Sequence, residues 1–114
     1  IKKEHLTIIK DGKEFDIYFN QIAYIEYSLR DTTIYLNNNS KIKLSEKSLS
    51  LLSKELDERF YQINRNIIIN LDMEPIYNKG TVKINHNEFQ VSRRNQKDLK
   101  IKILERSIYN ARNI

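Results

Sequence analysis

The chain has 114 residues, which fits one domain that is large enough to bury a core without disulfides or a structural metal. Hydrophobic residues make up 39% and charged residues 31%, the balance of a globular protein, and no apolar run approaches the ~20 residues that span a bilayer. The absence of Cys excludes disulfides, thiolate metal ligands and a nucleophilic thiol, and it fits a cytoplasmic protein.

The positive charge is concentrated in the second part of the chain. The net charge is +5, and residues 1–62 contain ten Lys and Arg against ten Asp and Glu, whereas residues 63–114 contain ten against five. Lys and Arg bind phosphates with an affinity that does not depend on sequence. The excess therefore indicates either an anionic partner or a solvated helix face between Arg93 and Lys102.

Most of the chain has the pattern of strands, because β-branched and aromatic residues alternate with polar ones. We expect strands at 6–9, 14–19, 22–28, 32–36, 41–44, 66–70, 73–78, 81–84 and 88–91. Turn-forming residues separate them at 11–12, 37–40, 78–80 and 85–87. Pro75 is expected at a strand start or on an edge strand, where a missing N–H costs least.

A first helix is predicted in the middle of the chain. Ser45 is the expected N-cap, Glu46 lies in the first turn, and the helix is expected to end near Asp57. Three leucines fall on one stripe of this helix: Leu49, Leu52 and Leu56.

A second helix is predicted over residues 93–105, after Ser92 as another candidate N-cap, with Leu99 and Ile103 on one face. Roughly 35 residues of strand pattern separate the two helices, which excludes a compact helix-turn-helix pair. If the protein binds DNA, loops and strand ends should therefore contact it. The expected core includes Tyr24, Ile25, Leu49 and 67–69, and Asn70 is expected to cap a turn.

The sequence contains no recognisable catalytic motif. His5 and His86 are far apart, and neither has a second ligand at metal spacing. Two glycines in the whole chain exclude a glycine-rich phosphate loop, and no Ser, His and Asp set indicates a triad. We therefore expect no enzyme activity, metal or cofactor.

Three motifs in order resemble the LytTR DNA-binding domain of bacterial response regulators. Ile22–Glu26 is similar to the family strand "I-x-Y-I-E", Phe60–Asn70 to "F-x-R-x-H-R-S-x-I-V-N", and Val91–Arg94 to the "V-S-R" segment. The resemblance extends from about Ile9 to Ile103. The chain departs from the family at three positions, which places some of the usual backbone contacts in doubt: Gln62 for Arg, Asn64 for His and Asn66 for Ser.

This resemblance implies a mainly β (α+β) fold, with antiparallel strands in small sheets and two helices packed beside them. Residues 1–114 would form a single domain, the C-terminal output module of a longer regulator with an N-terminal receiver domain. The implied partner is double-stranded promoter DNA carrying direct repeats, with a second copy of the protein on the adjacent repeat and no membrane association.

Carried over by position, the resemblance places three groups of residues against DNA. The first is the loop after the strand at 22–28, the second is the turn before the isoleucine run, and the third is the start of the last helix. The expected contact residues are Arg30, Thr32 and Thr33; Asn64, Arg65 and Asn66; and Ser92, Arg93, Arg94, Asn95 and Lys97.

The side-chain chemistry suits these roles. Arginine can bind guanine with two parallel hydrogen bonds, so Arg94 is the expected base reader in the major groove. Arg65 is expected in a narrow minor groove, and the first turn of the last helix can hold a phosphate. The alternative interpretation is a β-rich interaction module whose basic face binds an acidic protein or an anionic membrane surface.

Overall fold

The structure is a computed structural model that describes residues 3–45 and 48–113. The elements in chain order are β1 (His5–Lys10), β2 (Lys13–Tyr18), η1 (Phe19–Gln21), β3 (Ile22–Ser28), β4 (Asp31–Leu36), β5 (Lys41–Ser45), α1 (Leu49–Ser53), β6 (Phe60–Asn64), β7 (Ile67–Asn70), η2 (Leu71–Met73), β8 (Ile76–Asn78), β9 (Thr81–Ile84), β10 (Asn87–Gln90) and α2 (Arg93–Arg112). The predicted fold class, antiparallel strands in small sheets with two helices beside them, is confirmed.

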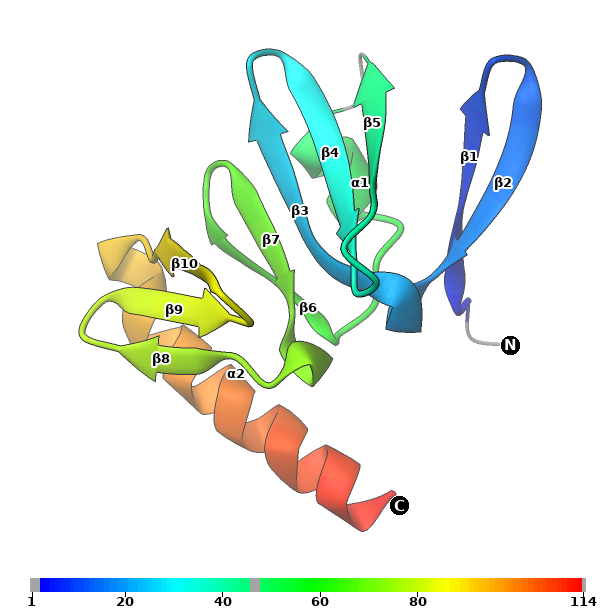
Figure 1. The fold of residues 1–114 in the computed structure, drawn as a ribbon. Coiled ribbons are helices and arrows are strands. Elements are labelled where there is room, and N and C mark those ends of the chain that lie inside the picture. The colour runs from blue at the N-terminus through cyan, green and yellow to red at the C-terminus, as the bar shows by residue number, and fades with distance from the viewer. Residues whose placement is uncertain (1–2, 46–47, 114) are drawn as a thin grey trace.

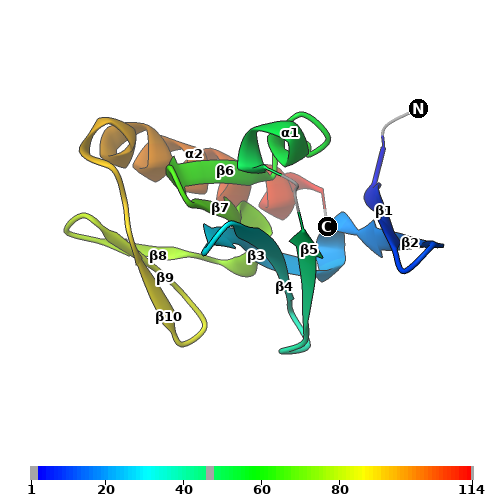
Figure 2. The ribbon, with the colours of Figure 1, turned by 90° about the horizontal axis from the view of Figure 1, so that it is seen from above.

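The strands form three sheets (Figure 1). A five-stranded sheet in the order β5-β4-β3-β7-β6 occupies the centre, and the β1-β2 hairpin and the three-stranded sheet β10-β9-β8 are separate from it. Seen from above, these two smaller sheets lie at opposite ends of the molecule (Figure 2). Every strand pair is antiparallel, so short turns can make most of the connections.

The isoleucine run in β7 is buried on both faces of the central sheet. Successive side chains of a strand point to opposite faces. Ile68 belongs to one hydrophobic cluster, whereas Ile67 and Ile69 belong to the other. The predicted burial of 67–69 is therefore confirmed, and an uninterrupted apolar run fits a strand that is covered on both sides.

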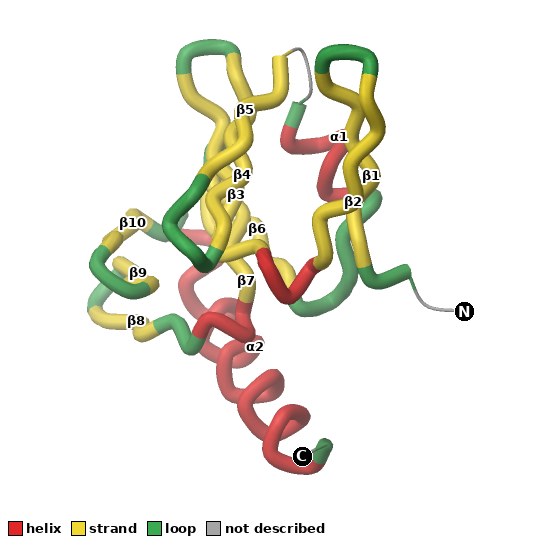
Figure 3. The backbone as a smooth tube through the Cα atoms, turned by 45° about the vertical axis from the view of Figure 1, so that its right-hand side comes forward, coloured by secondary structure: helices red, strands yellow, loops and turns green. Residues whose placement is uncertain are grey.

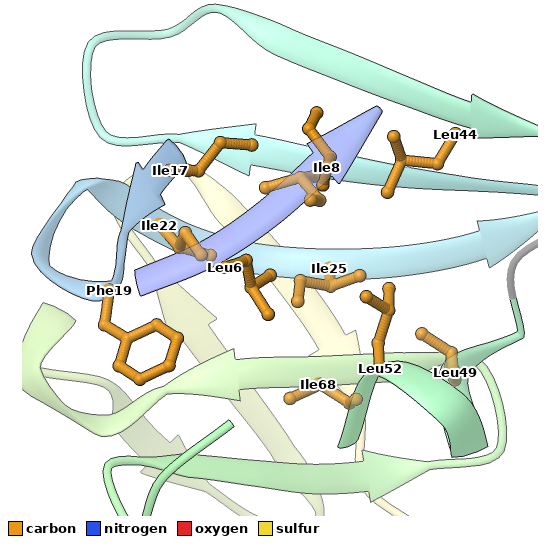
Figure 4. Close-up of a cluster of buried hydrophobic side chains, with 11 residues drawn as sticks. Leu6, Ile8, Ile17, Phe19, Ile22, Ile25, Leu44, Leu49, Leu52 and Ile68 are labelled. Atoms are coloured by element: carbon orange, nitrogen blue, oxygen red, sulfur yellow. The ribbon is translucent and has the colours of Figure 1, made fainter. Parts of the chain in front are cut away.

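The first cluster lies between the central sheet, the β1-β2 hairpin and α1. Leu6, Ile8 and Ile17 of the hairpin and Leu52 of α1 pack with Ile25 of β3 (Figure 4). Figure 3 shows α1 between the hairpin and the central sheet. An isolated two-stranded hairpin has little stability of its own, so this packing keeps β1 and β2 in place.

The second cluster joins the central sheet to the three-stranded sheet and to α2. Leu99 is fully buried in this cluster and Ile103 packs against it, which confirms the predicted inner face of α2. Tyr24 stacks on Tyr35 with ring centroids 4.5 Å apart and meets Phe89 edge-on at 4.8 Å. Burial, with the nearby Tyr35 and Glu26 charges, raises the pKa of Tyr24 to about 12.

Asn70 is a buried polar residue that fixes a connection, as predicted. Its side-chain oxygen accepts a hydrogen bond from the Asp72 backbone N–H at 2.8 Å. Its amide nitrogen donates to the Ile22 and Phe19 carbonyls at 2.8 and 3.3 Å. The side chain thus satisfies polar groups of η1, β3 and η2 that burial would otherwise leave unpaired.

The predicted first helix is wrong in extent, because α1 contains only Leu49–Ser53. Ser45 lies in β5, and the N-cap is Ser48, whose hydroxyl accepts a hydrogen bond from the Leu51 N–H at 3.3 Å. The Ser53 hydroxyl donates to the Ser50 carbonyl, a local bond of the kind that competes with helix continuation. The predicted role of Glu46 lies outside the described residues.

Other elements also differ from the prediction. The strand expected at 73–78 is shorter and begins at Ile76, because Leu71–Met73 form η2 and Glu74 has a positive φ of 53°. β6 was not expected, because its sequence FYQIN has no long apolar run, yet it pairs with β7 along the sheet edge. α2 continues to Arg112, beyond the predicted segment. Pro75 directly precedes the edge strand β8, as predicted. Within the described ranges, no helix is long and apolar enough to cross a membrane.

An ion pair attaches the second half of α2 to the rest of the fold. Arg106 donates from Nε and from one terminal guanidinium nitrogen to the two carboxylate oxygens of Asp72, at 2.7 and 3.1 Å. The Asn110 side chain donates to the same carboxylate at 2.8 Å. Burial alone would raise the pKa of Asp72, but these hydrogen bonds and the charges of Arg106 and Arg59 outweigh it, so the pKa is lowered.

Candidate nucleic-acid interface

Three connections lie together at one edge of the molecule: the β3-β4 turn, the β6-β7 turn and the junction between β10 and α2 (Figure 1). A surface hollow of about 720 Å³ lies among them. Its lining includes five of the residues expected to contact DNA: Asn64, Arg65, Asn66, Ser92 and Arg94. The fold therefore brings two of the three predicted groups to a single site, although 25 residues separate Asn66 from Ser92 by position number.

Hydrogen bonds fix the β6-β7 turn to both of its neighbours. The Asn64 side-chain oxygen accepts from the Asn66 N–H at 2.7 Å, and its nitrogen donates to the Gln90 carbonyl of β10 at 2.7 Å. The Asn66 carbonyl in turn accepts from the Tyr27 N–H of β3 at 2.8 Å. Arg65, between the two asparagines, therefore projects from a backbone that is held on both sides.

The start of α2 is attached to β6 in a similar way. The Ser92 N–H donates to the Ile63 carbonyl at 2.9 Å, and the Asn95 side chain donates to the same carbonyl at 3.3 Å. Ser92 occupies the N-cap position, as predicted, although its hydroxyl makes no capping hydrogen bond. These contacts set the position of Arg93 and Arg94 relative to the β6-β7 turn.

Tyr61 gives a further connection between β6 and α2. Its hydroxyl donates to the Asp98 carboxylate at 2.9 Å. Burial, together with this hydrogen bond and the Asp98 charge, raises the pKa of Tyr61 to about 12. The hydroxyl therefore remains a donor at neutral pH.

The cations of this edge are exposed. Within the part of the chain that the structure describes, Arg65, Arg93, Arg94 and Lys97 have no carboxylate partner at ion-pair distance. Such side chains keep their donors available for a ligand, and the guanidinium fork matches phosphates and guanine edges.

The hollow also has acidic lining. Glu26 and Glu88 contribute to it, and Glu26 accepts a hydrogen bond from the Tyr35 hydroxyl at 3.4 Å. Burial, followed by the charge and hydrogen bond of Glu26, raises the pKa of Tyr35. Carboxylates repel a phosphate backbone, so their presence makes the site selective about where an anion can approach.

The structure corrects the expected position of two residues in the first group. Arg30 lies in the β3-β4 turn and is exposed, but Thr32 and Thr33 belong to β4 and are not part of the turn. The Thr32 side chain is 0% exposed and Thr33 is half-buried opposite Glu26. The turn consists of Leu29 and Arg30 and is one residue shorter than the connection between the strands expected at 22–28 and 32–36.

Sequence reasoning also missed residues that shape the site. Gln90 and Tyr27 take part through their backbone groups, which carry no side-chain signal in a sequence. Leu29 does not line the hollow, but it occupies the adjacent β3-β4 turn, where an aliphatic residue is unusual. The two histidines play no part in this edge, and among the described residues no group of three or more His, Cys, Asp or Glu could hold a metal.

Comparisons with known proteins agree on one family. The model of the LytTr DNA-binding domain matches residues 12–104. A solved structure described as the LytTr DNA-binding domain of a methyl-accepting/DNA response regulator from Bacillus cereus superposes with a TM-score of 0.69. That comparison covers 90% of this chain and 98% of the other at 16% identity, so it concerns the fold. No match was found among curated proteins.

Proposed function

The chain belongs to the LytTr DNA-binding domain family, and from this membership we propose that it binds promoter DNA sequence-specifically as the output domain of a transcriptional regulator. The observation that best supports the proposal is the hollow that places Arg65 and Arg94 together on rigid backbone. Two arginines held in fixed relative positions can contact two places on one duplex. Flexible arginines would mostly bind phosphates.

Arg94 is the proposed base reader of the major groove. It lies in the first turn of α2, its guanidinium is exposed, and the backbone beneath it is bonded to β6 through Ser92. A guanidinium can donate two hydrogen bonds to guanine O6 and N7, which discriminates against other bases by about 1–3 kcal/mol.

Arg65 and Asn66 are proposed to approach the minor groove between two major-groove contacts. Both side chains are exposed in the two-residue β6-β7 turn. A narrow minor groove over A·T pairs has enhanced negative potential, which attracts an arginine.

Asn64 and Asn95 are proposed to position the readers rather than to read bases themselves. The Asn64 side chain is already bonded on both of its polar atoms, and the Asn95 nitrogen is directed to the β6 backbone. Arg93, Lys97 and the N–H groups near Ser92 are proposed to contact phosphates, and Arg30 to contact DNA from the β3-β4 turn.

The finer features of the proposal come from the family resemblance. We propose that the target is a pair of direct repeats in a promoter, with a second copy of the chain on the adjacent repeat. An N-terminal receiver domain would control the longer protein, and such a regulator would act on DNA in the cytoplasm.

Selection of bound duplexes from a random pool tests this function. We expect one enriched motif that occurs as two copies at fixed spacing. A gel-shift titration then compares the selected duplex with a scrambled duplex of equal length at physiological salt, where specific binding should be at least about 1,000-fold tighter. Equal binding of the two would contradict the proposal and favour an electrostatic interaction module.

A further inference from the structure

The β3-β4 hairpin has an unusual turn. Its two central residues, Leu29 and Arg30, have φ of 52° and 69°, so both lie in the left-handed region. A two-residue hairpin loop with positive φ at both positions matches the twist of the strands, but it strongly favours Asn, Asp and Gly. Leu is poorly suited to this conformation, because its Cβ approaches the following carbonyl.

Two other hairpins of the same chain show how such a turn is ordinarily built. The β1-β2 turn uses Asp11 and Gly12, and the β8-β9 turn uses Lys79 and Gly80, with positive φ at all four residues. Each has glycine at its second position. The β3-β4 turn has no glycine, so its second position, Arg30, retains strain that the other two turns avoid. Its first position carries Leu29, a branched apolar side chain, where the other two turns carry Asp11 and Lys79.

Packing within the chain does not offset this strain. Leu29 is 92% exposed, which makes it the most exposed large hydrophobic residue in the described ranges. An exposed leucine gains no burial energy in the free protein. Strained backbone that bears a residue without an internal role points to a contact made outside the chain.

The position of the turn identifies the partner surface. Tyr27 and Ser28, which directly precede Leu29, line the same hollow as Arg65 and Arg94. Tyr27 is also bonded through its N–H to Asn66. Leu29 therefore extends beyond the hollow on the edge that carries the proposed base readers.

We propose that Leu29 contacts the C5-methyl group of a thymine in the major groove and so determines specificity at one base pair. This inference rests on the proposed function. A leucine side chain has no hydrogen-bond donor or acceptor, and the thymine methyl is the apolar feature that a base pair presents in that groove. The major groove admits a two-stranded β-ribbon, which is the shape of the β3-β4 hairpin.

Substitution of deoxyuridine for thymine tests the contact directly, because the two bases differ only by this methyl group. In the duplex selected by the wild-type chain, each thymine is replaced in turn. We expect one position at which the wild-type chain loses about three- to fivefold in affinity, as for one buried methyl group. The Leu29→Asn variant should bind the thymine and uracil duplexes equally at that position.

Leu29→Asn is informative because asparagine suits the left-handed turn. Its melting temperature should equal or exceed that of the wild type, so reduced binding cannot be attributed to unfolding. Ile9→Asn is the matched control, since Ile9 is also an exposed aliphatic residue but lies in the β1-β2 hairpin, away from the hollow. That variant should keep the wild-type response to every uracil.

Three results would overturn the inference. The first is a wild-type chain that tolerates uracil at every position, and the second is a Leu29→Asn variant that retains the response. The third is a Leu29→Asn variant that bends the selected duplex less than the wild type does, while neither protein responds to uracil, which would indicate that Leu29 inserts between bases in the minor groove. In each case the preference for the selected duplex over the scrambled one would remain, whereas failure of the proposed function would remove that preference as well.

Discussion

The two halves of α2 use arginine in opposite ways. In the first turn, Arg93 and Arg94 are exposed and have no carboxylate partner among the described residues. In the second half, Arg106 is 12% exposed and is bonded through two nitrogens to Asp72. The same residue type on one helix is thus exposed at one end, where contact with DNA is proposed, and forms a structural ion pair at the other.

This difference shows why charge alone does not identify a binding site. Arg59 resembles Arg106, because its guanidinium is largely buried and pairs with Asp57 at 2.9 Å. A count of basic residues treats Arg59, Arg94 and Arg106 alike. Their partners separate them, and the comparison predicts that stability and DNA affinity respond to different substitutions.

The largest expected effect on stability is that of Arg106→Ala. The substitution removes two charge-assisted hydrogen bonds and leaves the Asp72 carboxylate partly desolvated without its partner. We expect a loss of about 2–3 kcal/mol in the free energy of unfolding. Urea denaturation measures the loss, and the folded variant should bind the selected duplex with wild-type affinity.

Arg112→Ala is the control for this substitution, because Arg112 lies near the same end of α2 and is exposed. It should change the free energy of unfolding by less than about 0.5 kcal/mol. Equal destabilisation by the two substitutions would mean that the ion pair with Asp72 contributes nothing specific.

Arg94→Ala should have the opposite effect to Arg106→Ala, because it should weaken DNA binding and leave stability unchanged. We expect specific binding to the selected duplex to weaken by about 1–3 kcal/mol and discrimination at one base pair to disappear. The melting temperature should stay within about two degrees of the wild type, since an exposed side chain contributes little to stability. A variant that still selects the same base, or one that melts early, contradicts the assignment.

Periodicity in the sequence predicted the strands and the buried face of α2 better than it predicted the length of α1. Strand patterns, the inner face of α2 and the burial of 67–69 followed from periodicity, because both faces of a covered strand must be apolar. The length of α1 did not follow, since a leucine stripe predicts a helix while local serine hydrogen bonds end it. The motif order predicted that Arg65 and Arg94 would both face DNA, and in the structure both line one hollow.

What the sequence could not supply was the partner of each polar side chain. Asn64 has the residue type of a base reader, yet its amide is bonded to Gln90 and Asn66. Thr32 was expected in a turn but is buried in β4, because the hairpin closes with only two residues. Turn length depends on strand register, which tertiary pairing decides.

Acid should weaken the ion pair between Asp72 and Arg106, which attaches the second half of α2 to the fold. The pKa of Asp72 is lowered in the folded chain from its ordinary value of 3.8, so the folded state binds fewer protons there than the unfolded state. The stabilising contribution is therefore fully present above the unfolded pKa and is lost as pH falls through the folded pKa. Urea denaturation at pH 7 and pH 3 should show a smaller acid-induced loss for Asp72→Asn than for the wild type.

The smallest effect belongs to Lys97, which lies in the first half of α2 and is exposed. If it contacts a phosphate, Lys97→Ala should reduce the slope of log affinity against log salt by about 1 without altering the selected motif. Lys41→Ala is the control, because Lys41 begins β5 at the end of β4 opposite the β3-β4 turn, and it should leave the slope unchanged. An equal change for both lysines would mean that the salt dependence reflects the net charge of the domain and not a contact made by Lys97. The difference between the two halves of α2 would then rest on Arg94 and Arg106 alone.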